Sequence, residues 1–152
     1  EDSDSGVRVA AVQTLGKLPP EELAAHAAAV LAKLEHSDGG VRRAAVETLG
    51  QLPPEVLAAH AATVLAKLEH SDAGVREVAV QTLGQLPPEV LAAHAAALKK
   101  VAEEDKEARV QIAAHGVLHK IEPAAGHIDA VVAKLEDSDW GVREVAVQTL
   151  GQ

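Results

Sequence analysis

Hydrophobic and polar residues alternate with a helical period in two consecutive segments of residues 37–70. Positions three and four residues apart share one face of a helix, so each segment predicts a helix with one buried face. The face of the first segment consists of Val41, Ala44, Ala45, Thr48, Leu49 and Leu52. That of the second consists of Leu57, Ala61, Val64, Leu65 and Leu68. The pattern predicts a pair of helices that pack through these two faces.

Capping and breaking residues mark the ends of both predicted helices. Asp38 precedes the first helix, and aspartate is a preferred N-cap because it accepts hydrogen bonds from the unpaired N–H groups there. Gly50 is predicted to terminate the first helix, as glycine does in many C-caps. Pro54 suits the first turn of the second helix, where its missing N–H is no loss.

The same pattern recurs along the chain with a period of 34 residues. Aspartate recurs with this period at positions 4, 38 and 72 (Asp4, Asp38, Asp72). Leucine does so at Leu15, Leu49 and Leu83, and histidine at His26, His60 and His94. A fixed period of this length predicts a solenoid, in which each helical hairpin buries its apolar face by stacking on its neighbours. We expect one solenoid over 1–152. Its repeats are predicted at about 3–36, 37–70, 71–105 and 106–137, with a half repeat at 138–152.

The fourth repeat departs from the others. Residues 107–123 align with 38–54 without a gap, which requires one extra residue within 98–107 and two missing residues around 124–127. This alignment places Glu107 and Gln111 where the other repeats have Asp and Arg. An alternative alignment keeps Asp105 and Arg109 as the Asp/Arg pair, but it needs more gaps, and we prefer the first.

Composition limits both the core and the partners. Hydrophobic residues make up 47% of the 152, but there is one Trp and no Phe, Tyr or Met, so Ala, Leu and Val must fill the core. Side chains this small favour close helix packing, near the short end of the roughly 8–10 Å range. A net charge of −9 argues against nucleic acid as a partner. The lack of stacking aromatic residues argues further against single-stranded nucleic acid.

Compartment and membrane association follow from what the sequence lacks. There is no cysteine, hence no disulfide framework or thiolate chemistry. No signal peptide is visible, and no apolar run approaches the roughly 20 residues that span a bilayer. We expect a soluble chain without membrane insertion, in the cytoplasm or an organelle interior rather than secreted.

The repeated motif resembles that of a known family. It is carried in the second repeat by Asp38, Val41, Arg42, Ala44, Ala45, Leu49 and Gly50. The pattern resembles the HEAT repeat, specifically its short phycobilisome-lyase-like variety, and it is shared with designed HEAT-like arrays. The resemblance covers essentially the whole chain. A tetratricopeptide array has the same period and stays a minor alternative, although its Trp, Tyr and Phe positions are empty here.

This resemblance implies the fold and its supporting contacts. The expected fold is all-α, a right-handed α-solenoid of stacked antiparallel hairpins with about four and a half HEAT-like repeats. Stacked Asp and Arg residues of successive repeats would form a structural ladder, and the family pattern assigns it to Asp4, Arg8, Asp38, Arg42, Asp72, Arg76, Asp139 and Arg143. Because these residues recur in the repeats, we expect them to be structural and not catalytic.

The resemblance also implies where partners bind. In this family the second helices line the concave face, and here that face would be almost entirely alanine. Its residues are Ala25, Ala28, Ala29, Ala32, Ala59, Ala62, Thr63, Ala66, Ala93, Ala96 and Ala97. Trp140 is the single aromatic residue, and it either contacts a partner or folds over its own repeat. We expect unidentified protein partners, and end-to-end self-association through the uncapped terminal repeats, because the final helix leaves apolar residues uncovered.

Histidines are the remaining candidates for chemistry. His115 and His119 are four residues apart on one predicted helix face, which is half of a zinc-binding arrangement, but no glutamate accompanies them as in HExxH. Neighbouring repeats lie too far apart for the column of His26, His60, His94 and His127 to share one metal ion. His36 and His70 precede N-caps and are expected to be exposed. We therefore predict no metal, cofactor or catalytic residue.

Two functions follow. The first is a non-enzymatic protein-interaction scaffold or structural spacer, as a segment of a larger chain or assembly. The alternative is a lyase-like protein, or one that handles a metal or cofactor, with a site in the irregular segment 98–130 that uses His115, His119 and His127.

Overall fold

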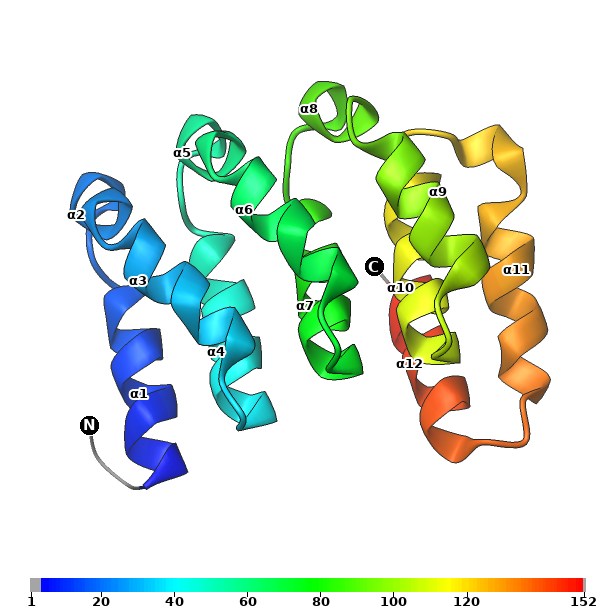
Figure 1. Ribbon diagram of the computed structural model, residues 1–152, viewed down its shortest axis with the longest axis horizontal. Coiled ribbons are helices and arrows are strands. Elements are labelled where there is room, and N and C mark those ends of the chain that lie inside the picture. Colours follow the sequence, from blue (N-terminus) through cyan, green and yellow to red (C-terminus); the bar gives the residue numbers. More distant parts are fainter. Residues whose placement is uncertain (1–3, 152) are drawn as a thin grey trace. The chain divides into compact units, whose positions relative to one another are not determined.

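The structure is a computed structural model that describes residues 4–151, which form helices and turns without a β-strand. The predicted all-α solenoid of successive helical hairpins is confirmed. The helices group into two compact units, Glu1–Leu86 and Pro87–Gln152 (Figure 1). Residues 1–3 and 152, which fall within the predicted limits of the solenoid, lie outside the described part. None of the helices in residues 4–151 is long and apolar enough to cross a membrane.

The first helix of each repeat forms where the apolar pattern predicts it. These helices are α1 (Ser5–Leu15), α4 (Gly39–Leu49) and α7 (Ala73–Leu83) in the first unit, and α10 (Ala108–His119) and α12 (Trp140–Leu150) in the second. In α4 and the turn after it, every residue of the predicted face from Val41 to Leu52 is buried. The helix α1 packs against α4, and α4 packs against α7 (Figure 1).

The second helices differ from the prediction, because each of the first three is broken in the middle. The fragments are α2 (Pro20–Ala25) and α3 (Ala27–Ala32), α5 (Pro54–Ala59) and α6 (Ala61–Ala66), and α8 (Pro88–Ala92) and α9 (Ala95–Glu104). At the first break His26 has φ −105° and ψ 3°, although its carbonyl still accepts the N–H of Val30 at 3.1 Å. Figure 1 shows α2 nearly end-on, whereas α3 runs across the view.

The bend does not disturb the burial that the sequence pattern predicted. Leu57 precedes the bend in the second repeat and Val64 follows it, yet both are buried. Ala61 and Leu68 are also buried, and Leu65 is half-buried. Hydrophobic spacing reports which side chains are covered and not the direction of the axis, so it could not reveal the break.

The last turn of most second helices is tighter than an α-helix. The segments η1 (Lys33–Glu35), η2 (Lys67–Glu69) and η4 (Lys134–Glu136) are 3₁₀ turns, whereas α9 stays α-helical to Glu104. A 3₁₀ turn uses 3.0 residues and an α turn 3.6. The wider turn of α9 therefore accommodates the extra residue that the alignment placed within 98–107.

The second unit closes around its own small core. Ile112, Val131 and Ala146 are buried together, and Leu135, Val142 and Val145 pack against them. The second helix of its fourth repeat is shortened to η3 (Pro123–Ala125) and α11 (His127–Ala133). Gly126 joins them with φ 74°, a left-handed conformation that glycine adopts without a steric penalty. This glycine turn lies at the predicted two-residue deletion.

Gly50 does not end its helix in the way the sequence suggested. Its φ of −66° is right-handed, as is the −63° of Gly16, so neither position needs glycine for its backbone conformation. Glycine instead permits close approach by the next repeat. A Cβ on Gly16 would lie 3.3 Å from both Thr48 Oγ1 and Gln51 Nε2, and one on Gly50 would collide with Gln85. These close contacts come from the neighbouring repeat, so they cannot be seen in the sequence of one repeat alone.

Candidate functional site

Aspartate caps the first helix of four repeats, as expected. Asp38 Oδ1 accepts the N–H of Val41 at 3.0 Å, and Asp72 Oδ1 accepts that of Val75 at the same distance. Asp4 accepts the N–H of Gly6 at 2.7 Å, and Asp139 caps α12 likewise. These bonds satisfy N–H groups that have no partner within the helix.

The motif arginine closes the turn in front of its own helix. Arg42 Nη1 donates to the carbonyl oxygens of His36 at 2.7 Å and Ser37 at 3.0 Å. Arg76 and Arg143 make the same pair of bonds, with lengths of 2.9 and 3.1 Å and of 2.7 and 3.0 Å. Charged donors strengthen such bonds, so each arginine ties the end of one hairpin to the start of the next.

Arg42 also reaches the following repeat. Its guanidinium lies over Gly74, where any side chain would collide with it. The Val75 N–H bond and then the charge of Arg42 lower the pKa of Asp72. These contacts link the second and third repeats and account for glycine two residues after Asp72. The remainder of the predicted Asp/Arg ladder stays a prediction.

His36 and His70 are not simply exposed, which corrects the sequence-based expectation. Both are half-buried, and their Nδ1 atoms accept the N–H groups of Asp38 and Asp72, each at 3.0 Å. In the second unit Asp105 and Asp137 hold the corresponding positions and accept N–H groups at 2.9 and 3.0 Å. The shared property is a hydrogen-bond acceptor, and the alternation of His with Asp at this position was the available signal.

The fourth repeat follows the preferred alignment. Glu107 occupies the N-cap position of α10, although its side chain makes no capping bond. Gln111 Nε2 donates to the carbonyl of Asp105 at 2.7 Å, six residues back, just as Arg42 donates to His36. Gln111 therefore takes the arginine position, which supports the preferred alignment over the one that pairs Asp105 with Arg109.

The irregular segment brings together a different histidine pair from the predicted one. His115 of α10 faces His127 at the start of α11, with 3.2 Å between their Nδ1 atoms and 5.5 Å between ring centroids. His119 lies one turn further along α10, where its Nδ1 is buried without a hydrogen-bond partner. Residues four apart on one helix were the visible signal, whereas the contact that forms depends on the glycine turn before His127.

Two charged residues extend this pair. Glu122 Oε2 lies 3.7 Å from His127 Nε2, too far for a hydrogen bond, while Glu122 Oε1 is paired with Lys99 Nζ at 2.8 Å. The bond from Lys99 lowers the pKa of Glu122. Burial, and then the neighbouring His127, lower the pKa of His115, and Glu103 opposes this shift. Within residues 4–151, no three His, Cys, Asp or Glu side chains come together in positions to hold a metal ion.

The His115–His127 contact predicts a pH-dependent stability that one substitution should reduce. With a folded-state pKa below the usual value of about 6.5, His115 binds fewer protons in the folded than in the unfolded chain as the pH falls. Stability should therefore decrease from pH 7 to pH 5. We expect His115→Val, which installs the residue found at this position in α4, to show a smaller decrease in urea denaturation.

The matched control is His26→Gln, because His26 is exposed. It changes a histidine outside the His115–His127 contact, so its loss of stability from pH 7 to pH 5 should equal that of the original chain. If the free energy of unfolding changed equally with pH in His115→Val and in the original chain, the histidine contact would not contribute to the pH dependence of stability.

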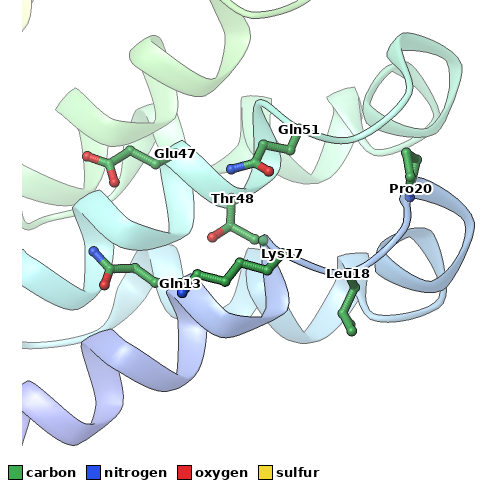
Figure 2. Close-up of a pocket in the computed structure, with 8 residues that line it drawn as sticks. Gln13, Lys17, Leu18, Pro20, Glu47, Thr48 and Gln51 are labelled. Atoms are coloured by element: carbon green, nitrogen blue, oxygen red, sulfur yellow. The ribbon is translucent and has the colours of Figure 1, made fainter.

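An open pocket lies between the ends of α1 and α4, and the sequence did not predict it. It has a volume of about 500 Å³. Its lining includes Gln13, Gly16, Lys17, Leu18, Pro20, Glu47, Thr48 and Gln51 (Figure 2). Thr48 Oγ1 is already engaged with the carbonyl of Val12 at 3.2 Å. The pocket therefore marks the seam between two stacked repeats, and its lining is partly polar and partly apolar.

Trp140 is exposed, with 70% of its surface accessible at the first position of α12. It does not fold over its own repeat, and its contact with a partner stays a prediction. The alanine surface of the second helices is exposed as expected in the first unit. Its side chains there are Ala25, Ala28, Ala29, Ala32, Ala59, Ala62, Thr63 and Ala66.

Comparison with protein families decides the classification. A family model described as HEAT repeats matches residues 1–84 and 27–118, which together cover more than half of the chain. The chain belongs to the HEAT repeat family. A second model, for a HEAT repeat associated with sister chromatid cohesion, matches residues 128–150. HEAT repeats generally act as protein-interaction scaffolds and typically not as enzymes.

Solved structures support the fold of this HEAT repeat chain. One similar structure is the crystal structure of an engineered protein from the Northeast Structural Genomics Consortium, with a TM-score of 0.50 and 19% sequence identity. The match covers 98% of this chain and 74% of the engineered one. Among curated proteins, none matches the sequence.

Proposed function

We propose that this HEAT repeat chain is a non-enzymatic scaffold that binds a protein partner along the exposed alanine surface of its second helices. The observation that carries the proposal is the repetition of that surface: positions 25, 28, 29 and 32 of the first repeat and 59, 62, 63 and 66 of the second are all exposed. The predicted ladder residues, by contrast, are expected to hold the repeats together. The alanine surface is thus free to contact a partner, while the buried side chains of each repeat pack against neighbouring repeats.

Small side chains suit this role for a physical reason. Alanine has no rotamer freedom to lose on binding, so a partner helix can approach closely without ordering the surface beneath it. Such a face lacks the aromatic and arginine anchors that usually dominate binding energy. Affinity must then come from an extended contact over several repeats, which is what a periodic surface offers.

The test is co-purification of a partner with the full chain and with Ala28→Glu/Ala62→Glu. Both alanines are exposed, so the variant should keep its helical content by circular dichroism while the partner is lost from the purified complex. The control is Ser71→Glu/Ser138→Glu, which adds the same charge at exposed turn positions and should retain the partner. A partner that stays with the alanine-surface variant would contradict the proposal.

A cation-binding role for segment 98–130 is the second candidate, and the His115–His127 contact is what favours it. Two nitrogen ligands at about 2.0–2.1 Å from a tetrahedral zinc ion are about as far apart as these Nδ1 atoms. The pair would provide two of the ligands that such an ion needs. Calorimetric titration with zinc decides: binding that His115→Val abolishes would support this candidate, and no binding would reject it.

A further inference from the structure

The turn that opens α4 contains the only Asp-Gly pair in the sequence, Asp38 and Gly39. We propose that this pair is a site of spontaneous covalent modification, at which Asp38 converts to isoaspartate whenever the first turn of α4 opens. The reaction needs no enzyme and no cofactor. It lies outside both the alanine surface and the histidine contact, so it does not depend on the proposed scaffold function.

The reaction joins two groups that are adjacent in the chain. The backbone nitrogen of Gly39 attacks Cγ of the Asp38 carboxyl group and loses its proton, while one carboxyl oxygen leaves as water, and a five-membered succinimide ring closes. Water then adds to one of the two ring carbonyls and breaks its bond to nitrogen. If the bond to Cγ breaks, aspartate is restored. If the bond to the former backbone carbonyl breaks, the chain runs through Cγ as isoaspartate, so water is the only co-reactant.

The aspartates that cap α1, α4, α7 and α12 provide a comparison within one molecule. Their φ angles lie between −80° and −78°, and their ψ angles are 122° or 123°. The residue after the aspartate differs, since it is Gly39 in α4 but Ser5, Ala73 or Trp140 in the other helices. A side chain on that residue hinders attack by its nitrogen. With the backbone the same in all four caps, Gly39 singles out the second repeat.

Gly39 is accessible for this reaction. Gly39 and the following Gly40 are both exposed. A Cβ added to Gly39 would have Arg42 Nη2 as its nearest side-chain neighbour, at 3.6 Å, which is an ordinary contact. The first N–H groups of a helix have no carbonyl partner within it. The attacking nitrogen is therefore neither covered by a side chain nor held by a hydrogen bond within α4.

The folded conformation nevertheless holds the two reacting atoms apart. Ring closure requires the Asp38 Cβ and the Gly39 nitrogen to eclipse each other about the Cα–C bond, which in an L-residue needs a strongly negative ψ. The observed ψ of Asp38 is 123°, and its Oδ1 accepts the N–H of Val41 at 3.0 Å. The capping bond must break and ψ must rotate before the ring can close. Local opening of this kind occurs at helix ends without unfolding of the whole chain.

Arg42 restrains this opening. Its Nη1 donates to the carbonyl oxygens of His36 at 2.7 Å and Ser37 at 3.0 Å, the two residues before Asp38. The guanidinium thus ties the backbone in front of Asp38 to the first turn of α4. Removing this donor should make the open turn more populated and the conversion faster. Conversion would in turn remove the cap of α4, the helix that packs against both α1 and α7.

Incubation of the 152-residue chain at mildly acidic pH, where the carboxyl oxygen can leave as water, tests the proposal. Peptide mapping by mass spectrometry, which separates isoaspartyl from aspartyl peptides, gives the conversion at each aspartate. We expect isoaspartate at Asp38 and not at Asp4, Asp72 or Asp139. Conversion of Asp38 should be at least about tenfold slower in the folded chain than in urea at the same pH, because the open turn is a minor state.

Gly39→Ala is the matched control, because alanine follows the capping aspartate in α7 and the new Cβ has room. It should keep its helical content by circular dichroism and abolish conversion. Arg42→Met should speed conversion in the folded chain by about tenfold, the effect of losing hydrogen bonds from a charged group. Arg42→Gln should convert nearly as slowly as the original, since glutamine makes the corresponding bond in the fourth repeat. In urea both Arg42 variants should convert at the rate of the original chain.

Equal rates of conversion in the folded chain and in urea would overturn the proposal, because the capping turn would then give no protection. Equal conversion at all four capping aspartates, or none at Asp38, would do the same. An Arg42→Met variant that keeps its helical content but converts as slowly as the original would show that opening of this turn does not set the rate. The comparison of the original chain with Gly39→Ala, folded and in urea, remains decisive if Arg42→Met does not fold.

Discussion

Replacing Leu49 with alanine is expected to lower the free energy of unfolding by about 2–5 kcal/mol. Leu49 is fully buried, and it belongs to α4, a helix that packs against both α1 and α7. Removing its branched end leaves a cavity, and stacked helices with small side chains have little freedom to close it. Urea denaturation followed by far-UV circular dichroism measures the loss.

The repeated sequence provides a matched control for this prediction. Leu150 occupies in α12 the position that Leu49 has in α4 and Leu83 in α7. The three residues before it, Val-Gln-Thr, are those that precede Leu83, but Leu150 is 38% exposed. Leu150→Ala should therefore cost less than about 1 kcal/mol. Similar losses for Leu49→Ala and Leu150→Ala would mean that position in the helix, and not burial by neighbouring repeats, determines stability.

Replacing Gly116 with alanine should have the second largest effect, a loss of about 1–3 kcal/mol. Alanine stabilises an unobstructed helix relative to glycine by up to about 1 kcal/mol, so propensity alone predicts a gain at this position in α10. Here the new Cβ would collide with the Cγ2 methyl of Thr149 on α12. Threonine is stiff at χ1 and cannot easily turn away. Thermal denaturation of the variant measures the loss.

Thr149→Ser isolates the cause, because it removes that methyl group and leaves the Cβ of residue 149 at 3.8 Å, an ordinary contact. In the Thr149→Ser background, Gly116→Ala should become neutral or stabilising. The double-mutant cycle should then show a coupling energy of at least about 1 kcal/mol. Additive effects would show that α10 and α12 do not meet closely at this point.

Much of the fold followed from periodicity. The spacing of Val41, Leu49 and Leu57 predicted both helices of a hairpin and their buried faces, because burial on a helix repeats with the helix period. Aspartate at the N-caps of α1, α4, α7 and α12 followed from local chemistry, since the capping bond joins residues two or three apart. The match of Gln111 to Arg42 was also predictable, because an alignment without gaps needs only the order of residues.

The candidate site was less accessible to sequence reasoning. His115 and His119 share a helix face, so they formed the visible pair, but His115 contacts His127. That contact depends on the left-handed turn at Gly126, which positions α11 against α10. The acceptor role of His36 was also missed, because its signal appears only when the equivalent positions of four repeats are compared and Asp is found in place of His in two of them.

The order of residues by itself determined the 34-residue period, the helical hairpin and its buried faces, and the caps, because each of these depends on spacing along one segment. Only the tertiary structure decided the bend at His26, the close approach over Gly50 and the pairing of His115 with His127. Each of these depends on segments that meet in space after folding. Contact with a neighbouring helix does not alter the hydrophobic periodicity of the sequence, so the sequence pattern does not reveal it.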